Sequence, residues 1–473
     1  MARSVKVASL QPNVPDLEDN YIESDEIGHD VVLINPEVRS CRCSRRKCIM
    51  YTVAALVVTL ITIRLAFFLY GSNKVETFER DLESHLVSGK FAGKLNGLSP
   101  DVVAKELMEI HRLGGISDDA SLELSRFLMF ENFARSYNKK YAGIVSKHAG
   151  FINFRNNLAI IEAHDRNPDA IYKKGLNHFS DMDIKDVTSK LLHPINAKHE
   201  IVNNVIKLSD MSLADATSVE YSMLKGYGNN LAKLNLNDRA NFEDIDWRRA
   251  GVVTPVKDQK QCGSCWAFAA VAAVESTILQ EASTLHILSE QELVSCESGS
   301  EGCNGGFSDL ALQYIVNNGI SASENWPYEG IDVECKVHSG ERHYIRSFVT
   351  ANGFDVAEKL LVRAPTVVYI SVNEDLVFYS GGIYNGECDS QNLNHAVLLV
   401  GEGYDAETNK RYWLLKNSWG PDWGENGFFK MERTNSGYDK CGVLSFGFMP
   451  YGYSNKRAAT FQSTQSKGPK MGD

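Results

Sequence analysis

The chain has 473 residues, which is longer than one domain of ordinary size. Hydrophobic residues make up 43% of it, and this share excludes a wholly disordered chain. There are 49 Lys and Arg residues against 60 Asp and Glu, giving a net charge of −11. Because nucleic-acid binding favours a basic surface, no nucleic-acid partner is expected.

The N-terminal part predicts a tail followed by a membrane anchor. Residues 1–47 are polar and end in a basic cluster. Residues 48–71 are apolar apart from Arg64 and a few hydroxyls, and about 24 such residues can cross a bilayer. A cleaved signal peptide is the alternative, which the long leading segment disfavours. The basic cluster predicts a type II orientation, with a cytosolic tail and a lumenal remainder.

Three cysteines, Cys41, Cys43 and Cys48, belong to this first part. On the cytosolic side their thiols would stay reduced. Palmitoylation and unmodified thiols both remain open. A zinc site is disfavoured because no histidine lies among them.

Residues 72–240 carry helical patterns and then a polar segment. Phenylalanines recur at helical spacing in 122–137, and a second pattern follows at 145–163. The segment 203–241 is polar and contains Gly-Tyr-Gly-Asn-Asn, which predicts an exposed linker.

The segment 259–268 reads Gln-Lys-Gln-Cys-Gly-Ser-Cys-Trp-Ala-Phe and opens an alanine-rich helix, expected from Trp266 to about Leu279. Cys265 would therefore lie at a helix N-terminus. There the helix dipole and the unpaired backbone N–H groups favour the thiolate, which is the nucleophilic form. For an isolated cysteine a buried core position would be the better interpretation, but its neighbours here point to a nucleophile.

Two polar residues downstream can complete a nucleophilic site. His395 follows Cys265 by about 130 residues and precedes a buried-strand pattern at 396–400. Asn417 follows another strand pattern at 411–415. Its side chain can accept a hydrogen bond from one ring nitrogen of His395, leaving the other for sulfur.

The Gln-x-x-Cys-Gly-Ser-Cys-Trp motif, followed by His and then Asn, resembles the papain-family, cathepsin L-like cysteine proteases. The resemblance implies Cys265 as nucleophile, His395 as its base and Asn417 as the group that orients the base. Gln259 would help to bind the oxyanion, and Trp419 would shield the His–Asn bond from water. Trp419 would also bind substrate, as part of the tract 419–423 that forms the wall on the leaving-group side. No metal or organic cofactor is expected.

Seven of the ten cysteines lie beyond the apolar segment, and this odd number suits three disulfides plus one free thiol. Spacing alone does not fix their connectivity. The resemblance implies the pairs Cys262–Cys303, Cys296–Cys335 and Cys388–Cys441. Such bridges need an oxidising compartment, in agreement with a lumenal location.

The resemblance also assigns a substrate cleft. Gly305 and Gly306 would let an extended peptide approach the backbone, although an ordinary glycine turn is the alternative. Phe446, five positions after the last cysteine, would floor the pocket for the second residue before the cleaved bond. An aromatic floor without a carboxylate predicts that Leu, Val or Phe is accepted and Arg rejected.

The segment 175–181 resembles the G-x-N-x-F-x-D motif of papain-family propeptides. The preceding helix keeps only part of the propeptide pattern. It retains Phe154, Asn157 and Ile161 and departs at Ser146, Gly150 and Asp165. Residues 246–248, Asp-Trp-Arg, resemble the start of a mature domain, so processing is expected between about 220 and 245.

The resemblance implies an α+β, two-lobed papain-like fold. A helical left lobe and an antiparallel barrel-like right lobe would follow a mainly helical propeptide and one transmembrane helix. The expected parts are a cytosolic tail (1–47), an anchor (48–71), an inhibitory propeptide with linker (72–240), a catalytic domain (241–450) and a flexible tail (451–473).

This architecture resembles the membrane-anchored falcipain-like and piroplasm enzymes of apicomplexan parasites. The likeness implies an acidic lysosome-like or food-vacuole compartment and host proteins such as haemoglobin as substrates. The chain's own propeptide and cystatin-like inhibitors would be its inhibitory partners. Falcipains carry a docking insertion between His and Asn, but only 405–411 fills that place here. Two alternatives remain, namely a peptide-binding protein without turnover and a sorting or signalling role for the tail.

Overall fold

The computed structural model describes residues 45–195, 206–207, 244–336, 340–434, 436 and 439–456. The chain divides into two compact units, residues 1–71 and 72–473. Cys41 and Cys43, and all of the predicted tail except its last three residues, lie outside the described residues.

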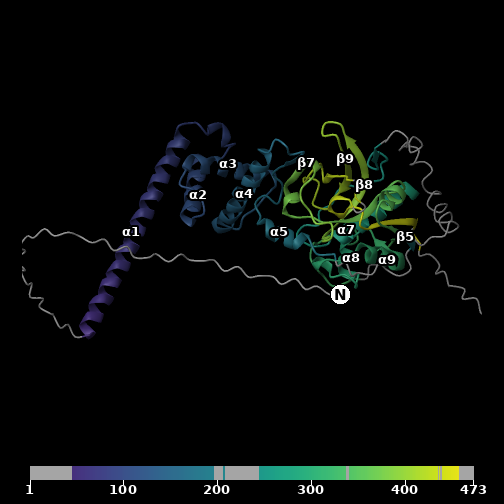
Figure 1. The fold of residues 1–473 in the computed structure, drawn as a ribbon, viewed down its shortest axis with the longest axis horizontal. Helices are drawn as coiled ribbons and strands as arrows, with labels where there is room; N and C mark the ends of the chain where they lie inside the picture. Colours follow the sequence, from purple (N-terminus) through teal and green to yellow (C-terminus); the bar gives the residue numbers. More distant parts are fainter. Residues whose placement is uncertain are drawn as a thin grey trace, which may run out of the picture. The chain divides into compact units, whose positions relative to one another are not determined.

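Helix α1 (Arg45–Val87) contains the apolar segment (Figure 1). It is long and apolar enough to cross a membrane, with a candidate span of Val53–Val87. Large apolar side chains such as Leu56 and Ile61 are about 60% exposed along it. The helix does not end at residue 71, which is the predicted end of the membrane anchor. The polar residues that follow remain helical up to Val87.

The elements after α1 begin with three α-helices, and from β1 onward strands and helices are mixed. The helices are α2 (Pro100–Leu113), α3 (Ala120–Ser136), α4 (Ile144–Asp165), α5 (Ile184–Leu191), α7 (Cys265–Ala282), α8 (Glu290–Cys296) and α9 (Ser308–Asn318). The strands are β1 (Tyr172–Lys174), β2 (Ile206–Lys207), β3 (Ile245–Asp246), β4 (Ile320–Ser321), β5 (Arg342–Ala351), β6 (Thr366–Ile370), β7 (Tyr379–Tyr384), β8 (His395–Asp405), β9 (Lys410–Lys416), β10 (Phe428–Glu432) and β11 (Gly447–Ser454).

The predicted aromatic helices are α3 and α4, whose ends differ from the prediction by one to two residues. Asp119 caps α3 by accepting a hydrogen bond from the Leu122 N–H, 3.0 Å away. The phenylalanines of both helices interlock in one core, in which the rings of Phe127 and Phe151 meet edge-to-face at 5.4 Å. This core joins residues from Phe78 to Leu158, whereas Tyr172, Phe179, Val187 and Leu191 pack in the core of the sheet. Residues 72–195 are called here the helical region.

The described strands form one sheet in the order β1-β7-β10-β9-β8-β6-β11-β5-β2, with β3 paired to β8 and β4 to β5. The central neighbours β9, β8 and β6 run antiparallel. Helix α7 packs against β8 and is buried along most of its length (Figure 1). Its alanines allow this close packing, so the helix that begins with Cys265 is held firmly against the strand that begins with His395.

The helical region docks on the sheet through its own short strand. β1 pairs antiparallel with β7, and the Asn177 side chain donates to the Val377 carbonyl at 2.7 Å. Lys174 and Tyr172 both bind the carboxylate of Asp375. We call these last three residues the Asp375 clasp.

The predicted flexible tail from residue 451 is wrong at its start. Tyr451 to Ser454 belong to β11 and pair with β5, and Tyr451 is 5% exposed in a small hydrophobic cluster. Burial of the Tyr451 ring favours continuation of β11 beyond residue 450. Of the predicted linker 203–241, the structure describes only β2, which pairs parallel with β5.

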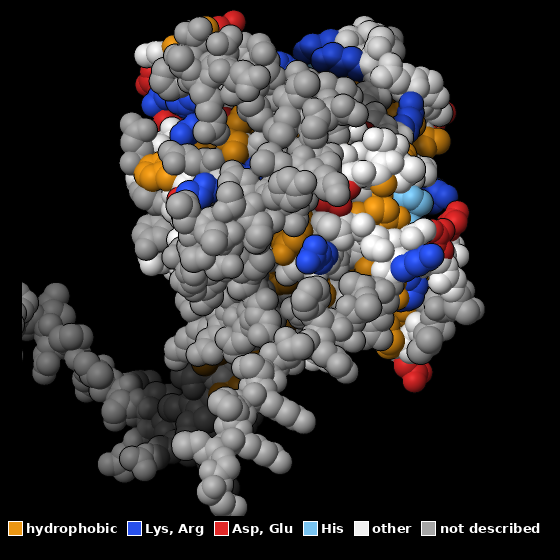
Figure 2. All heavy atoms as spheres, turned by 90° about the vertical axis from the view of Figure 1, so that its right-hand side faces the viewer, with side chains coloured by type: hydrophobic (Ala, Val, Ile, Leu, Met, Phe, Trp, Pro, Cys, Tyr) orange, Lys and Arg blue, Asp and Glu red, His pale blue; other side chains and the backbone are white. Residues whose placement is uncertain are grey.

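The surface carries mixed charges on the face drawn in Figure 2, where Lys and Arg side chains lie near acidic ones. Among the surface ion pairs of the described residues, the Lys410 ammonium lies 2.7 Å from a carboxylate oxygen of Glu432. Such pairs at exposed positions add little stability.

The Asp375 clasp should be insensitive to mild acid. Burial raises the pKa of Asp375, but hydrogen bonds from Lys174 and Tyr172 outweigh it and leave the pKa below its usual 3.8. A carboxylate with a lowered pKa stabilises the docked state above its free pKa and loses this effect only as the pH falls below that value. We therefore expect Asp375→Asn, which removes the charge facing buried Lys174, to weaken docking about tenfold at both pH 7 and pH 5.

The measurement is the rate at which an added protease trims the helical region of the full-length chain, in a Cys265→Ala background. Lys173→Ala, on the exposed position of the same strand, is the control and should trim at the unaltered rate. An effect of Asp375→Asn that vanishes at pH 5 would show that the carboxyl is already protonated there.

Candidate active site

Cys265 is the first residue of α7 and is 5% exposed. The backbone N–H groups of Ala396, Trp266 and Cys265 itself lower the pKa of its thiol. Burial nevertheless raises the pKa of the thiol to about 11. The expected thiolate is therefore wrong for this state of the molecule, because the cost of burying a charge exceeds what the helix terminus and the N–H groups supply.

His395 opens β8 and is fully buried. Its Nε2 lies 2.8 Å from Oδ1 of Asn417, which follows β9. Because an amide oxygen only accepts, Nε2 carries the proton and Nδ1 offers a lone pair. Nδ1 has no partner among the described residues. Burial lowers the pKa of His395 to about 4, so imidazole and thiol are both neutral near pH 7.

Trp419 covers the bond between His395 and Asn417. Its indole is buried, and its ring centroid lies 5.1 Å from that of His395. From the helical region, Phe179 meets Trp419 edge-to-face at 5.9 Å. Two aromatic rings therefore exclude water from this hydrogen bond, which strengthens it.

Gln259 is fully buried, and two hydrogen bonds fix its amide. Its Oε1 accepts from the Ser418 hydroxyl at 2.6 Å, and its Nε2 donates to the Cys262 carbonyl at 2.8 Å. One N–H of the amide therefore remains for another acceptor. Ser418 was missed in the sequence, where the only signal is a small hydroxyl residue between Asn417 and Trp419.

A segment of the helical region lies along the same site. His193 donates its backbone N–H to the Asn394 carbonyl at 3.2 Å, and Ile195 donates to the Leu393 carbonyl at 2.8 Å. Nε2 of His193 is buried without a partner among the described residues. Residues 193–195 thus run past the start of β8, directly beside His395. The sequence carried no motif there that could have predicted this.

Two glycines make room for His193. A Cβ added to Gly305, whose φ is +113°, would lie 2.9 Å from the His193 Cβ. A Cβ at Gly263 would lie 2.0 Å from its ring. Gly305 therefore lies directly against the His193 side chain. At Gly306 a Cβ would meet the Trp266 ring at 2.5 Å, so packing of the adjacent tryptophan already requires glycine.

Phe446 is half-buried, with its ring centroid 6.0 Å from that of Tyr369. Phe446 and Ile195 pack against the same hydrophobic cluster, which contains Leu393 and Ala396. The side chain at position 446 therefore packs on the same apolar cluster as the Ile195 side chain.

The structure contains the disulfide pairs that the resemblance implied, which are Cys262–Cys303, Cys296–Cys335 and Cys388–Cys441. Within the described residues, Cys265 is a buried free cysteine. The bridge at Cys262 holds the loop just before α7, and this fixes the approach to Cys265.

The neutral state of Cys265 predicts a low reactivity that depends on residues 193–195. With a pKa near 11, the thiol should react with iodoacetamide at least about 100-fold more slowly at pH 7 than an ordinary cysteine, whose pKa is about 8.5. The rate should rise up to about pH 11. It should also rise at pH 7 once residues 193–195 have been removed from the full-length chain by acid treatment.

Mass spectrometry of the labelled peptide measures this rate, with Cys265→Ser as the blank. Fast labelling of the intact chain at pH 7 would contradict the burial argument.

Comparison with known proteins agrees with this geometry. Residues 242–451 match the model of the papain family cysteine proteases, and residues 130–186 match the cathepsin propeptide inhibitor domain. A cysteine proteinase of Theileria annulata is 37% identical over 93% of this chain and 99% of its own length. Falcipain-3 of Plasmodium falciparum is 35% identical over 68% of this chain and 65% of its own length.

Among solved structures, the digestive procathepsin L2 proteinase from Tenebrio molitor larval midgut is similar. It covers 69% of this chain and 99% of its own, with a TM-score of 0.57 and 30% identity. The helical region therefore contains an inhibitory propeptide, and the chain is a zymogen. This protein belongs to the papain family of cysteine proteases.

Proposed function

We propose that Cys265, His395, Asn417 and Gln259 perform peptide hydrolysis in this protease. The observation that carries the proposal is the 2.8 Å hydrogen bond between Nε2 of His395 and Oδ1 of Asn417, at the start of a strand that packs against the helix begun by Cys265. This bond leaves Nδ1 of His395 without a partner among the described residues, which supports its role as the base for the thiol.

The reaction then follows from the groups present. Nδ1 of His395 takes the proton of Cys265, and the thiolate attacks the substrate carbonyl carbon. The oxyanion binds the free amide N–H of Gln259 and the backbone N–H of Cys265. His395 returns its proton to the leaving amine, which departs and leaves an acyl-enzyme. Water, deprotonated by His395, attacks the thioester and releases the acid and the thiol.

The propeptide keeps this machinery inactive. Residues 193–195 occupy the cleft beside His395, and burial holds the thiol protonated and the imidazole neutral. An ion pair between Cys265 and His395 can form once water and substrate replace the propeptide.

Acid release of the propeptide is supported by His178. Burial lowers its pKa, and nearby Lys139 lowers it further, whereas Asp258, Asp422 and Asp181 raise it. A histidine with a lowered pKa favours docking above its free value of about 6.5 and disfavours it progressively below. Acidification through pH 6 therefore loosens the propeptide, which fits maturation in a lysosome-like or food-vacuole compartment.

The substrates are proposed to be proteins with Leu, Val or Phe as the second residue before the cleaved bond. Apolar Phe446 and the neighbouring cluster support this preference, since neither offers a carboxylate to bind Arg. Host haemoglobin is a candidate protein substrate by likeness to the parasite relatives. Cystatin-like inhibitors would bind the same open cleft.

The apolar half of α1 is proposed as a type II membrane anchor. Its side chains are exposed from Val53 to Ala66, and a bilayer is the environment in which such an apolar surface is stable. The basic residues before it favour a cytosolic N-terminus, and the three disulfides favour an oxidising compartment for the protease.

The decisive experiment compares full-length wild type with Cys265→Ala in detergent, before and after acidification. Wild type should cleave a fluorogenic Leu-Arg substrate and denatured haemoglobin after acid treatment. It should cleave an Arg-Arg substrate at least about tenfold less efficiently. Cys265→Ala should be inactive. A wild type that is processed and oxidised but turns over no substrate would favour the peptide-binding alternative.

Orientation is tested by protease protection of the full chain in sealed microsomes. The type II anchor predicts that only the N-terminal 47 or so residues are trimmed from outside. Loss of the catalytic domain on trimming would contradict this orientation, and release of the chain by carbonate washing would contradict membrane spanning.

A further inference from the structure

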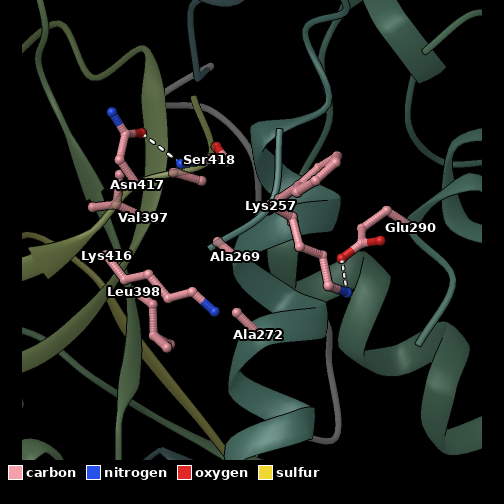
Figure 3. Close-up of a pocket in the computed structure, with 11 residues that line it drawn as sticks. Lys257, Ala269, Ala272, Glu290, Val397, Leu398, Lys416, Asn417 and Ser418 are labelled. Carbon is pink, nitrogen blue, oxygen red and sulfur yellow. Dashed lines mark hydrogen bonds and ion pairs between the residues drawn. The ribbon is translucent and has the colours of Figure 1, made fainter. Parts of the chain in front are cut away.

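A small pocket lies between α7 and the strands β8 and β9, and Asn417 and Ser418 are among the residues that line it (Figure 3). Its volume of about 20 Å³ is enough for roughly one water molecule. Ala269 and Ala272 of α7 face it from one side and Lys416 from the other. Burying an ammonium group is costly, so it requires hydrogen-bond acceptors and opposite charges nearby.

The Lys416 side chain reaches across from β9 toward α7 (Figure 3). The residue is 5% exposed, and its Nζ donates to the Thr254 hydroxyl at 3.0 Å. Thr254 in turn donates to the carboxylate of Glu275 on α7 at 2.5 Å. A chain of two hydrogen bonds therefore joins the end of β9 to the helix that carries Cys265.

Two further charged groups, Lys257 and Glu290, adjoin this chain. Lys257 lies 2.7 Å from Glu275 and 2.5 Å from Glu290. Glu275 also accepts the Leu288 N–H at 2.9 Å. Together with Lys416, the four groups balance two positive against two negative charges. Removing one of them leaves a buried charge without its counterpart.

The position of Lys416 in the chain connects this cluster to catalysis. Lys416 is the last residue of β9, and Asn417 and Ser418 follow it directly. These two residues bind His395 and Gln259, respectively. A shift of the strand end would therefore move the partners of both catalytic side chains together.

We propose that Lys416 is a positioning residue for catalysis. Its ammonium, bound to Thr254 and facing Glu275, fixes the end of β9 against α7 and thereby holds Asn417 on His395 and Ser418 on Gln259. The inference rests on the proposed roles of Asn417 and Gln259, and it assigns the buried cluster a part in the reaction.

The charge on Lys416 separates this role from a merely structural one. Burial lowers the pKa of Lys416 to about 8; Glu275 and Glu290 raise it, while Lys257 lowers it further. A lysine with a lowered pKa makes the folded state more stable, not less, as the pH rises from about 8 to the free value of 10.5. Loss of the ammonium should therefore lower turnover over a range in which it does not lower stability.

The test uses the acid-processed full-length enzyme, with kcat and KM measured from pH 5 to pH 10. An irreversible thiol inhibitor counts the competent sites, so that misfolded molecules do not contribute. We expect Lys416→Met to lower kcat at least about tenfold at pH 7 with KM within about twofold. Lys416→Arg should keep most of kcat and move its alkaline decline to higher pH, because guanidinium stays charged. Lys410→Met, at the exposed start of β9, is the matched control and should behave as wild type.

Each outcome decides the point. Wild-type kcat in Lys416→Met, or an unmoved alkaline decline in Lys416→Arg, would overturn the positioning role. If Lys416→Met does not fold, the test uses Thr254→Val and the pH dependence of kcat in Lys416→Arg. Thr254→Val should also lower kcat with little change in KM. An inactive wild type would contradict the proposed function instead.

Discussion

The contact between the N-terminus of α7 and the first residues of β8 is the constraint on which this molecule depends. Here the helix that begins with Cys265 packs against the strand that begins with His395. The alanines of α7 allow the close approach, and the disulfide at Cys262 fixes the loop that leads into it. Neither element alone contains both the proposed nucleophile and its proposed base.

Burial has opposite uses in the two states of such an enzyme. With the propeptide in place, the lack of water keeps both Cys265 and His395 uncharged. The same dry surroundings strengthen the hydrogen bond that orients His395, under the ring of Trp419. The propeptide contacts this ring through Phe179 and the sheet through the Asp375 clasp. The same apolar environment therefore serves inhibition when the propeptide occupies it and catalysis when a substrate peptide replaces the propeptide.

The sequence predicted the chemistry well, because a nucleophile and its partners must be particular residue types. Cys265, His395, Asn417 and Gln259 could be named from motifs, and the helix and strands that hold them came from hydrophobic periodicity. The thiol's protonation state could not be predicted in this way, since it depends on chain segments that cover it from far away in sequence. His193 and Ser418 were missed for the same reason, as their roles exist only through tertiary contacts. The strand at Tyr451 was missed because a polar, glycine-containing stretch gives no periodic signal.

Removal of the propeptide has a consequence for the sheet as well as for the cleft. β1 is the outermost strand on its side of the sheet and covers β7. Once it leaves, the backbone N–H and C=O groups of β7 become an open edge, which in principle invites pairing with another molecule. The edge is short, only six residues, and Gly382 turns it out of the extended conformation with a φ of +83°. A bent, brief edge is a poor template for a second strand, so the mature enzyme can lose its cover and still resist self-association.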